Sequence, residues 1–457
     1  MAIIAQGKLF GWEEVERLGD LERLRLVLSA LPDEALMRRL EARRGRGRDD
    51  YPVRATWNSV VAGVVFGHES VASLRRELKR NAQLRQVCGF DPLDGAKAVP
   101  TDRAYSHLLK NLLSCEAELR AMLDELVDGL EKELPDFGEN LAVDSKAINS
   151  HGKPSKKEEK DGRRDTDADW GAKTSKGKNK DGSLWEKVTR WFGYKVHLLV
   201  DASYELPVAF EVTRASVNDT TMLMPLVQKT KKRHEELVER AQTLAADRGY
   251  DSKKNCAGLY DDYGIKPLID IRDCWDEEGI ESEGSTRVLF ENRADQIVYD
   301  FRGTVYCQCP VTDERREMAY MGFESDRGTL KYRCPSAAYG LECKGRSICG
   351  GGESGEFGRV IRIPIEKDRR VFTPLARSSY AWKNGYKKRT AVERVNSRLD
   401  MSFGFERHYI RGIKKMNFRV CLALLIMNAM ALGRIRAGQK DAMRSLVGEI
   451  KIKLKAA

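Results

Sequence analysis

The chain has 457 residues, of which 41% are hydrophobic and 33% charged, and its formal net charge is +11. This length allows two or three domains with a sizeable core and excludes a small disulfide-stapled module. The most apolar stretch, Val420 to Leu432, is shorter than the roughly 18 to 20 residues that a membrane helix requires. We therefore interpret it as a buried helix and expect no membrane association.

The N-terminus has no apolar leader of the kind that directs secretion, so we expect a cytoplasmic protein whose ten cysteines are thiols or metal ligands. The positive charge is concentrated near the C-terminus. Glu366 to Lys440 holds 18 Lys and Arg against 5 Asp and Glu, a surplus of 18 − 5 = 13 that exceeds the net charge of the whole chain. This distribution favours a polyanionic partner, although a charge run is also typical of a solvated surface.

Residues 1–138 are predicted to be helical, because leucines recur at spacings of three and four. Between Thr56 and Arg85 two helices should meet at the turn Phe66-Gly-His-Glu69, with Ser70 as the N-cap of the second. The second helix carries four basic residues: Arg75, Arg76, Lys79 and Arg80. The pair is either a helix-turn-helix that binds DNA or part of an ordinary helical domain, and we expect the region to serve DNA binding or dimerisation.

At residue 139 the hydrophobic period changes from that of a helix to that of a strand. The predicted strands are Leu141–Ile148, Trp191–Asp201, Pro207–Thr213, Thr243–Asp247 and Ile265–Ile271, with helices between the last three. This order predicts a mixed α/β sheet flanked by helices over residues 139–272. Residues 149–189, between the first two strands, are rich in Lys, Gly, Asp and Ser and should form a mobile loop.

Residues 273–381 combine short strand patterns, glycine-rich turns and clustered cysteines, which indicates an inserted subdomain. The clustered cysteines are Cys307, Cys309, Cys334, Cys343 and Cys349. A structural zinc ion would explain thiolates in a subdomain with little core. The spacing lacks paired Cys-x2-Cys motifs, however, and reduced, partly buried thiols are the alternative.

Residues 382–457 are predicted to contain two closing helices and a basic tail, with helices at about Gly385–Met401 and Ile413–Arg436. In the first, Tyr386, Arg389 and Glu393 fall within about 60° of one another at 100° per residue. The opposite side carries Val392, Val395 and Leu399, which should dock this helix on the sheet.

Three carboxylates are the candidate catalytic residues: Asp144, Asp247 and Glu393. Asp144 and Asp247 lie in apolar strands, where a charge is costly unless it has a partner or a metal ion. Phosphodiester cleavage and transfer commonly use two divalent ions about 4 Å apart, and carboxylate oxygens are the ligands that Mg²⁺ prefers. Mn²⁺ is the expected substitute. No Gly-x4-Gly-Lys phosphate loop occurs, so no nucleotide cofactor is expected.

These residues resemble the DDE transposases of bacterial insertion sequences, in the subgroup marked by a Tyr-x2-Arg-x3-Glu-x6-Lys signature. The resemblance runs from about Leu141 to Arg436 and rests on Ala-Val-Asp144-Ser-Lys, Ala-Asp247-Arg-Gly-Tyr, Phe-Glu-Val-Thr-Arg-Ala-Ser-Val-Asn-Asp219 and the Tyr386 to Glu393 helix. The intervals, 247 − 144 = 103 and 393 − 247 = 146, are similar to those of members with an insertion before the glutamate.

The resemblance implies an RNase H-like catalytic core, Mg²⁺ dependence and binding to the terminal inverted repeats of a mobile element. It further implies DNA nicking followed by attack of the freed 3′-hydroxyl on target DNA. A homodimer that holds two element ends in a synaptic complex, in the nucleoid of a bacterial cytoplasm, is the corresponding expectation.

One position departs from the signature: its lysine is Asp400 here. Phosphate contacts are therefore assigned to Tyr386 and Arg389 and to four further basic residues of this region: Lys387, Lys388, Arg394 and Arg398. Trp170, among lysines, is a candidate DNA contact as well. Two alternatives stay open: a catalytically impaired relative that represses by binding DNA, and an RNase H-like nuclease or resolvase without strand transfer.

Overall fold

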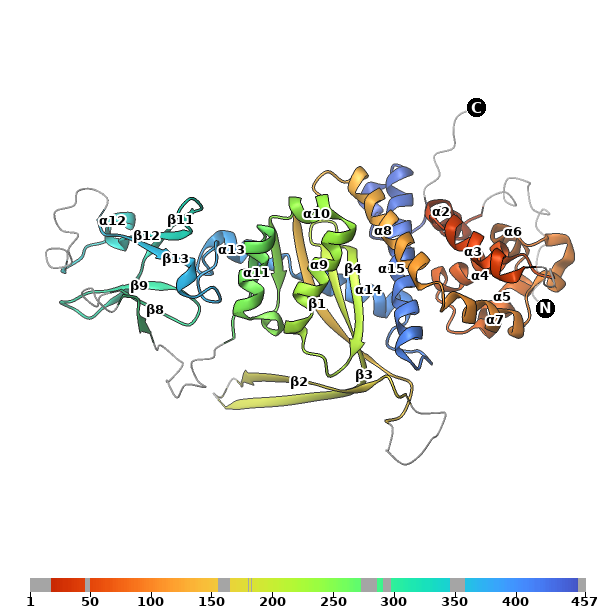
Figure 1. Cartoon of the computed structure of the whole chain (residues 1–457), viewed down its shortest axis with the longest axis horizontal. Helices are drawn as coiled ribbons and strands as arrows, with labels where there is room; N and C mark the ends of the chain where they lie inside the picture. The colour runs from red at the N-terminus through yellow and green to blue at the C-terminus, as the bar shows by residue number, and fades with distance from the viewer. Residues whose placement is uncertain are drawn as a thin grey trace, which may run out of the picture.

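The structure is a computed structural model that describes residues 18–45, 50–154, 165–179, 181, 183–272, 286–290, 297–345 and 358–450. Along its longest axis the molecule has a helical N-terminal part, a central sheet with helices on both faces, and a smaller β-rich part (Figure 1). The N-terminal helices and the central part share one hydrophobic core, whereas the β-rich part has a second core of its own.

The N-terminal part is helical, as predicted. Its helices are α2 (Leu21–Ala30), α3 (Glu34–Arg44), α4 (Val53–Val65), α5 (Val71–Arg80), α6 (Ala82–Cys88), the 3₁₀ helix η1 (Pro92–Ala98), α7 (Asp102–Leu112) and α8 (Glu116–Glu133). The predicted helix pair is confirmed as α4 and α5. Ser70 caps α5, because its hydroxyl accepts a hydrogen bond from the Ser73 N–H at 3.2 Å.

The central sheet contains all the predicted strands. They are β1 (Asn140–Asn149), β3 (Leu184–Asp201), β4 (Leu206–Arg214), β5 (Thr243–Ala246) and β6 (Lys266–Ile269), arranged in the order β4-β3-β1-β5-β6. β3 is antiparallel to both β1 and β4, while β1, β5 and β6 are parallel. The parallel pairing of β1 and β5 aligns the middle of β1 with the end of β5, which is where the candidate aspartates lie.

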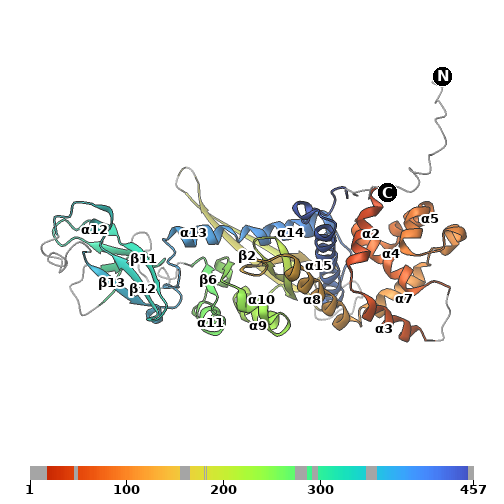
Figure 2. The ribbon, with the colours of Figure 1, turned by 90° about the horizontal axis from the view of Figure 1, so that it is seen from above.

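Helices cover both faces of this sheet. Figure 2 shows the sheet between α9 (Leu223–Arg233), α10 (Glu235–Arg240) and α11 (Lys253–Tyr263) on one side and α13 (Tyr380–Lys387) and α14 (Thr390–Phe403) on the other. The prediction of one helix over Gly385–Met401 was wrong. The N–H groups of Lys388 and Arg389 bond to carbonyls three residues back, both at 3.0 Å, and this tighter turn separates α13 from α14.

The closing helix α15 (Ile413–Arg436) has the predicted bounds. By length and composition it could cross a membrane, but 83% of its most apolar 18-residue stretch is buried inside the molecule. It packs against α8, α2 and β4. The helix is therefore the core element that joins the N-terminal part to the sheet.

The predicted mobile loop at 149–189 is wrong where the structure describes it. Residues Asp169–Lys178 form a strand, β2, that pairs antiparallel with the first half of β3. The two strands project from the body of the sheet as a two-stranded arm (Figures 1 and 2). Both faces of such an arm meet solvent, so its strands lack the apolar alternation by which a half-buried strand is recognised.

The β-rich part lies between β6 and α13, as predicted for an insertion. It contains β7 (Arg287–Val288), β8 (Ile297–Tyr299), β9 (Val305–Gln308), β10 (Arg315–Glu317), β11 (Ala319–Glu324), β12 (Thr329–Arg333), α12 (Pro335–Tyr339) and β13 (Val360–Pro364). These strands form two small antiparallel sheets, β10-β9-β8-β7 and β11-β12-β13. The domain boundaries at residues 138, 272 and 381 stay predictions.

Candidate active site

Asp144 and Asp247 lie next to each other on adjacent strands. Val143 on β1 is paired with Ala246 on β5. The residues that follow them in the chain, Asp144 and Asp247, therefore lie at the same level of the sheet. Asp144 lies in mid-strand, and Asp247 begins the turn after β5. Burial and the charge of Asp247 raise the pKa of Asp144 to about 7. The two carboxylates therefore repel each other in a poorly hydrated site that favours a cation.

A short turn orients the Asp247 carboxylate. Its Oδ1 accepts a hydrogen bond from the Gly249 N–H at 2.8 Å and so caps the 3₁₀ helix η3 (Arg248–Tyr250). A Cβ at position 249 would lie 2.8 Å from the same oxygen, closer than real Cβ atoms approach. Glycine at this position lets the carboxylate keep its orientation.

We therefore expect Gly249→Ala to lower DNA cleavage about 10- to 100-fold, the range typical for residues that orient metal ligands. The methyl group would displace the Asp247 carboxylate without touching a DNA-binding surface. A cleavage assay beside a DNA-binding measurement checks this prediction. Cleavage at the wild-type rate, in a variant with an unchanged melting temperature, would contradict it.

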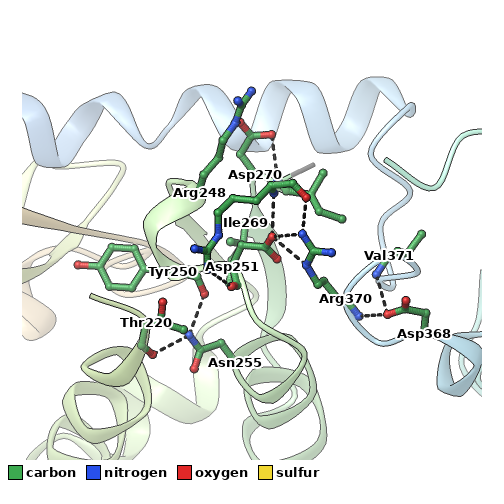
Figure 3. Close-up of polar contacts among 12 residues, drawn as sticks. Thr220, Arg248, Tyr250, Asp251, Asn255, Ile269, Asp270, Asp368, Arg370 and Val371 are labelled. Carbon is green, nitrogen blue, oxygen red and sulfur yellow. Dashed lines mark hydrogen bonds and ion pairs between the residues drawn. The ribbon is translucent and has the colours of Figure 1, made fainter. Parts of the chain in front are cut away.

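Buried ion pairs fix the segment after this turn (Figure 3). The buried Asp251 carboxylate accepts hydrogen bonds from the Arg272 N–H at 2.8 Å and from Arg370 Nε at 2.9 Å. Arg248 Nε donates to Asp270 at 2.5 Å, so the chain after β5 is tied to the chain after β6. Arg370 belongs to the C-terminal end of the β-rich insertion, so these contacts also dock the insertion beside the active site.

Glu393, Arg389 and Tyr386 form the predicted group. Arg389 Nη2 donates to Glu393 Oε1 at 2.6 Å, and the Arg389 guanidinium lies 5.8 Å from the centre of the Tyr386 ring. Tyr386 stacks on Trp382 with ring centres 4.8 Å apart. α14 packs against β1 through Val392, Val395 and Leu399, which are fully buried as predicted.

The carboxylates suit a divalent metal ion in part. Asp144 and Asp247 are neighbouring carboxylates on adjacent strands, and they supply the oxygen donors that Mg²⁺ requires. Glu393 is half-exposed and bound to Arg389. Among the residues that the structure describes, no three His, Cys, Asp or Glu side chains gather closely enough to hold one metal ion. Glu393 therefore does not complete a ligand set with the two aspartates while it is bound to Arg389.

Asp219 is a fourth carboxylate at this site, and sequence reasoning gave it no functional role. Its Oδ2 accepts a hydrogen bond from Ser145 Oγ at 2.9 Å, and its Oδ1 accepts one from Lys195 Nζ at 2.9 Å. Ser145 follows Asp144 directly, so this network positions β1 at the site. The only signal in the sequence was the position of Asp219 inside the phrase that carries the family resemblance.

Asp400, the departure from the signature, is paired with a lysine on the sheet. Lys146 Nζ lies 2.5 Å from Asp400 Oδ2, and both side chains are largely buried. Lys146 is two residues after Asp144 on β1 and so shares its face of the strand. Asp400 is two helical turns after Glu393. The ion pair therefore repeats the arrangement of Asp144 and Glu393 one step further from the site.

Comparison with known proteins decides the family. The family model described as "Transposase DDE domain" matches residues 136–429, which is more than half of the chain. The chain belongs to the DDE transposase family.

Two individual proteins are also similar to this DDE family member. Over 82 residues the chain is 38% identical to a protein of Burkholderia cepacia described as "Putative transposase for insertion sequence element IS402", a match that covers 17% of this chain and 37% of that relative. The cryo-EM structure of a piggyBac transposase synaptic complex with hairpin DNA is similar with a TM-score of 0.38 and 12% identity, over 94% of this chain and 80% of that one.

Arg394 and Arg398 of this DDE family member have protein partners. Both guanidinium groups bind Glu205, a buried residue in the turn between β3 and β4, and Arg444 binds the same carboxylate at 2.8 Å. Arg398 is largely buried, so its expected role becomes fixing this turn. Arg394 is 62% exposed, and its phosphate contact stays a prediction, as do those of Lys387 and Lys388.

The basic residues of α5 also fall into two groups, those with protein partners and those exposed on the surface. Arg75 is paired with Asp102 and donates to the Pro100 carbonyl at 2.8 Å, which ties α5 to α7. Arg80 is paired with Glu77 in its own helix. Arg76 and Lys79 are exposed. DNA contact by α5 stays a prediction that rests mainly on its exposed face.

Four of the five predicted zinc ligands line one cavity of about 230 Å³: Cys307, Cys309, Cys334 and Cys343. Hydrogen bonds from the Thr312 side chain and from nearby backbone N–H groups lower the pKa of Cys309 to about 7. Cys349 lies outside the described residues. The described sulfurs do not approach one another closely enough to hold a metal ion as they stand, so zinc stays a prediction.

Proposed function

We propose that this protein is the transposase of an insertion sequence, which binds the terminal inverted repeats, cleaves DNA and joins the freed 3′-hydroxyl to target DNA. One observation carries the proposal. Asp144 and Asp247 lie side by side on β1 and β5, and α14 packs over β1 with Glu393 and Arg389 on it. The family of the chain supports this reading.

The fold supports an RNase H-like core. The sheet order is β4-β3-β1-β5-β6, with the arm strand β2 left aside. The strands that come first in the chain, β1, β3 and β4, are antiparallel neighbours. The two strands that follow, β5 and β6, are parallel to β1 and are connected through helices α9–α11. The three proposed ligands come from the first strand, the fourth strand and a closing helix. The separation of the last two ligands in the chain accommodates the insertion between β6 and α13.

Each residue has a proposed task in this mechanism. Asp144, Asp247 and Glu393 would hold two Mg²⁺ ions, for which Mn²⁺ could substitute, and bound ions would supply activation of the attacking oxygen and stabilisation of the leaving oxygen. A DNA phosphate displaces Glu393 from Arg389 and binds the Arg389 guanidinium in its place. The ring of Tyr386 packs against that guanidinium. Lys387 and Lys388 contact the DNA backbone close by.

The proposed partners are double-stranded DNA at the element ends and at the target, with a second copy of the chain in the synaptic complex. The exposed face of α5, with Arg76 and Lys79, is the proposed contact of the N-terminal part. Cytoplasmic location and association with the nucleoid follow from this function. No membrane and no nucleotide cofactor take part.

The test is an assay with the DNA that flanks the gene, in which the proposal requires terminal inverted repeats. Purified protein is incubated with a labelled element end and Mg²⁺ or Mn²⁺, and then with a supercoiled plasmid. We expect metal-dependent nicks at the element boundary and covalent joining of the end to the plasmid. Absence of both products, with the element end bound, would instead identify a DNA-binding repressor.

Two alternative functions are a DNA-binding repressor, which is suggested by Asp400, and a nuclease or resolvase, which would use the cleavage chemistry alone. A repressor would bind the ends and never cut, while a nuclease or resolvase would cut and never join. Supplying pre-cut ends separates the last two, because only a transposase joins them to a plasmid. The Lys146–Asp400 ion pair favours the active enzyme, since it compensates the charge at the altered position.

A zinc ion in the insertion is a separate prediction. Four thiols around one cavity form a suitable donor set for Zn²⁺, which prefers thiolate ligands. We expect elemental analysis of the purified protein to give one zinc per chain, and Cys334→Ser to reduce that content. Protein without stoichiometric zinc would remove the prediction and leave reduced thiols as the interpretation.

A further inference from the structure

The two-stranded arm of β2 and β3 has two chemically different faces. One face carries two tryptophans and two lysines, which belong to every second cross-strand pair. These pairs are Trp191 with Gly171, Lys173 with Thr189, Lys187 with Ser175, and Trp185 with Gly177. No acidic residue occurs in these four pairs. The opposite face carries Trp170, which packs on Phe192, and one acidic residue, Glu186, among basic positions that include Arg190. We call the first of these the Trp–Lys face.

Glycines allow the two indoles of the Trp–Lys face to lie flat. A Cβ at Gly171 would lie 2.4 Å from the Trp191 ring, and one at Gly177 would lie 2.5 Å from the Trp185 ring. Glycine inside a strand weakens it and often marks a place where another chain approaches closely. Trp185 remains 42% exposed although it covers Gly177, so its outer ring face is open to a partner.

The Trp–Lys face continues into the active site. Lys195 Nζ lies 5.9 Å from the Trp191 ring centre, and the same ammonium donates to Asp219. By the register of β2 and β3, Lys173 lies one same-face step beyond the Gly171–Trp191 pair, on the side away from Lys195. A strand of DNA that leaves the catalytic carboxylates therefore meets Trp191 and Lys173 first and Trp185 last.

We propose that the Trp–Lys face binds unpaired nucleotides of the DNA strand whose phosphate occupies the active site. This inference rests on the proposed function and adds the partner of the arm. Exposed indoles stack on bases of any sequence, and lysines between them neutralise phosphates. Trp185 and Trp191 are six residues apart, or roughly 20 Å at 3.3 Å per residue, which matches about six nucleotides at 3.4 Å each.

The experiment measures binding of two DNA probes to the full-length protein without divalent metal. One probe is a fluorescent duplex with a 3′ overhang of about six thymidines, and the other is a blunt duplex of the same sequence. We expect wild type to prefer the overhang about tenfold, as one stacked base contributes roughly 1–3 kcal/mol. Trp185→Ala should lose that preference and bind the blunt duplex as before.

Matched variants separate DNA contact from a structural role. Val188→Ala truncates a similarly exposed apolar side chain on the opposite face and should keep the preference, while Trp185→Phe keeps a ring and should retain most of it. Lys187→Ala should lower the slope of log affinity against log salt by about 0.7 on the overhang probe. Equal losses in Val188→Ala and Trp185→Ala, or loss of binding to both probes, would overturn the proposal.

Failure of this inference is distinguishable from failure of the proposed function. If wild type cleaves and joins element ends but shows no overhang preference, the function stands and the arm has another role. If Trp185→Ala instead shifts the protein to a smaller species in size-exclusion chromatography, the face binds a second copy of the chain and the DNA proposal is wrong.

Discussion

Asp144→Asn is expected to lower cleavage of element ends at least about a thousandfold, since loss of a metal ligand removes roughly 4 kcal/mol of transition-state stabilisation. The amide keeps the shape of the side chain but withdraws one negative charge from the pair that Asp144 forms with Asp247. Binding of the element end should remain at the wild-type level, because the neighbouring charge repulsion falls and no basic residue is lost. Gel-based cleavage and fluorescence anisotropy measure the two effects.

Asp247→Asn serves as a parallel case and should behave in the same way. Asp262→Asn is the matched control, since Asp262 is an exposed aspartate on α11 and its loss should leave cleavage unchanged. Cleavage retained in Asp144→Asn would refute the assignment of this carboxylate to the metal ions. Loss of binding as well as cleavage would point to a structural role.

A charge swap at Lys146 and Asp400 should show whether the ion pair replaces the lysine of the family signature or whether that lysine is simply missing. Asp400→Lys restores the residue type of the family signature, yet it places two ammonium groups together in a largely buried position. We expect about 10- to 100-fold slower cleavage, as for groups that orient metal ligands, and a lower melting temperature. Adding Lys146→Asp should recover much of both losses.

The swap has a clear control. Glu406→Lys makes the same charge change at an exposed position shortly after α14 and should have little effect. If Asp400→Lys alone raises activity, the lysine of the signature is simply missing in this chain and the pair does not replace it. If the double variant is no better than the single variants, the two residues act independently.

Local patterns in the sequence were enough for most of the fold. Five of the six strands of the central sheet were predictable, because apolar residues fill buried segments such as Leu141–Val143 and Leu244–Ala246. α15 was predictable with its bounds, since it is long and its centre is nearly all apolar. The arm was missed because a strand exposed on both faces needs no apolar pattern, and its pairing with β3 supplies the backbone hydrogen bonds instead.

The candidate site was predictable only in its most local part. Tyr386, Arg389 and Glu393 are close in sequence, so helical geometry alone brings them together, even across the tight turn between α13 and α14. Asp144 and Asp247 could be proposed from apolar context and family resemblance. Their adjacency depends on β1 and β5 being parallel neighbours, which is a property of the sheet.

The sequence by itself determined most helix and strand segments and marked the three candidate carboxylates, because those signals reside within a few consecutive residues. The tertiary structure decided which charges neutralise one another. Lys146 bonds to Asp400 across 254 positions, Ser145 to Asp219 across 74, and Arg398 to the turn at Glu205 across 193. A side chain carries no local signal for a partner at that distance, since only packing of β1, β3 and α14 brings the two groups within reach.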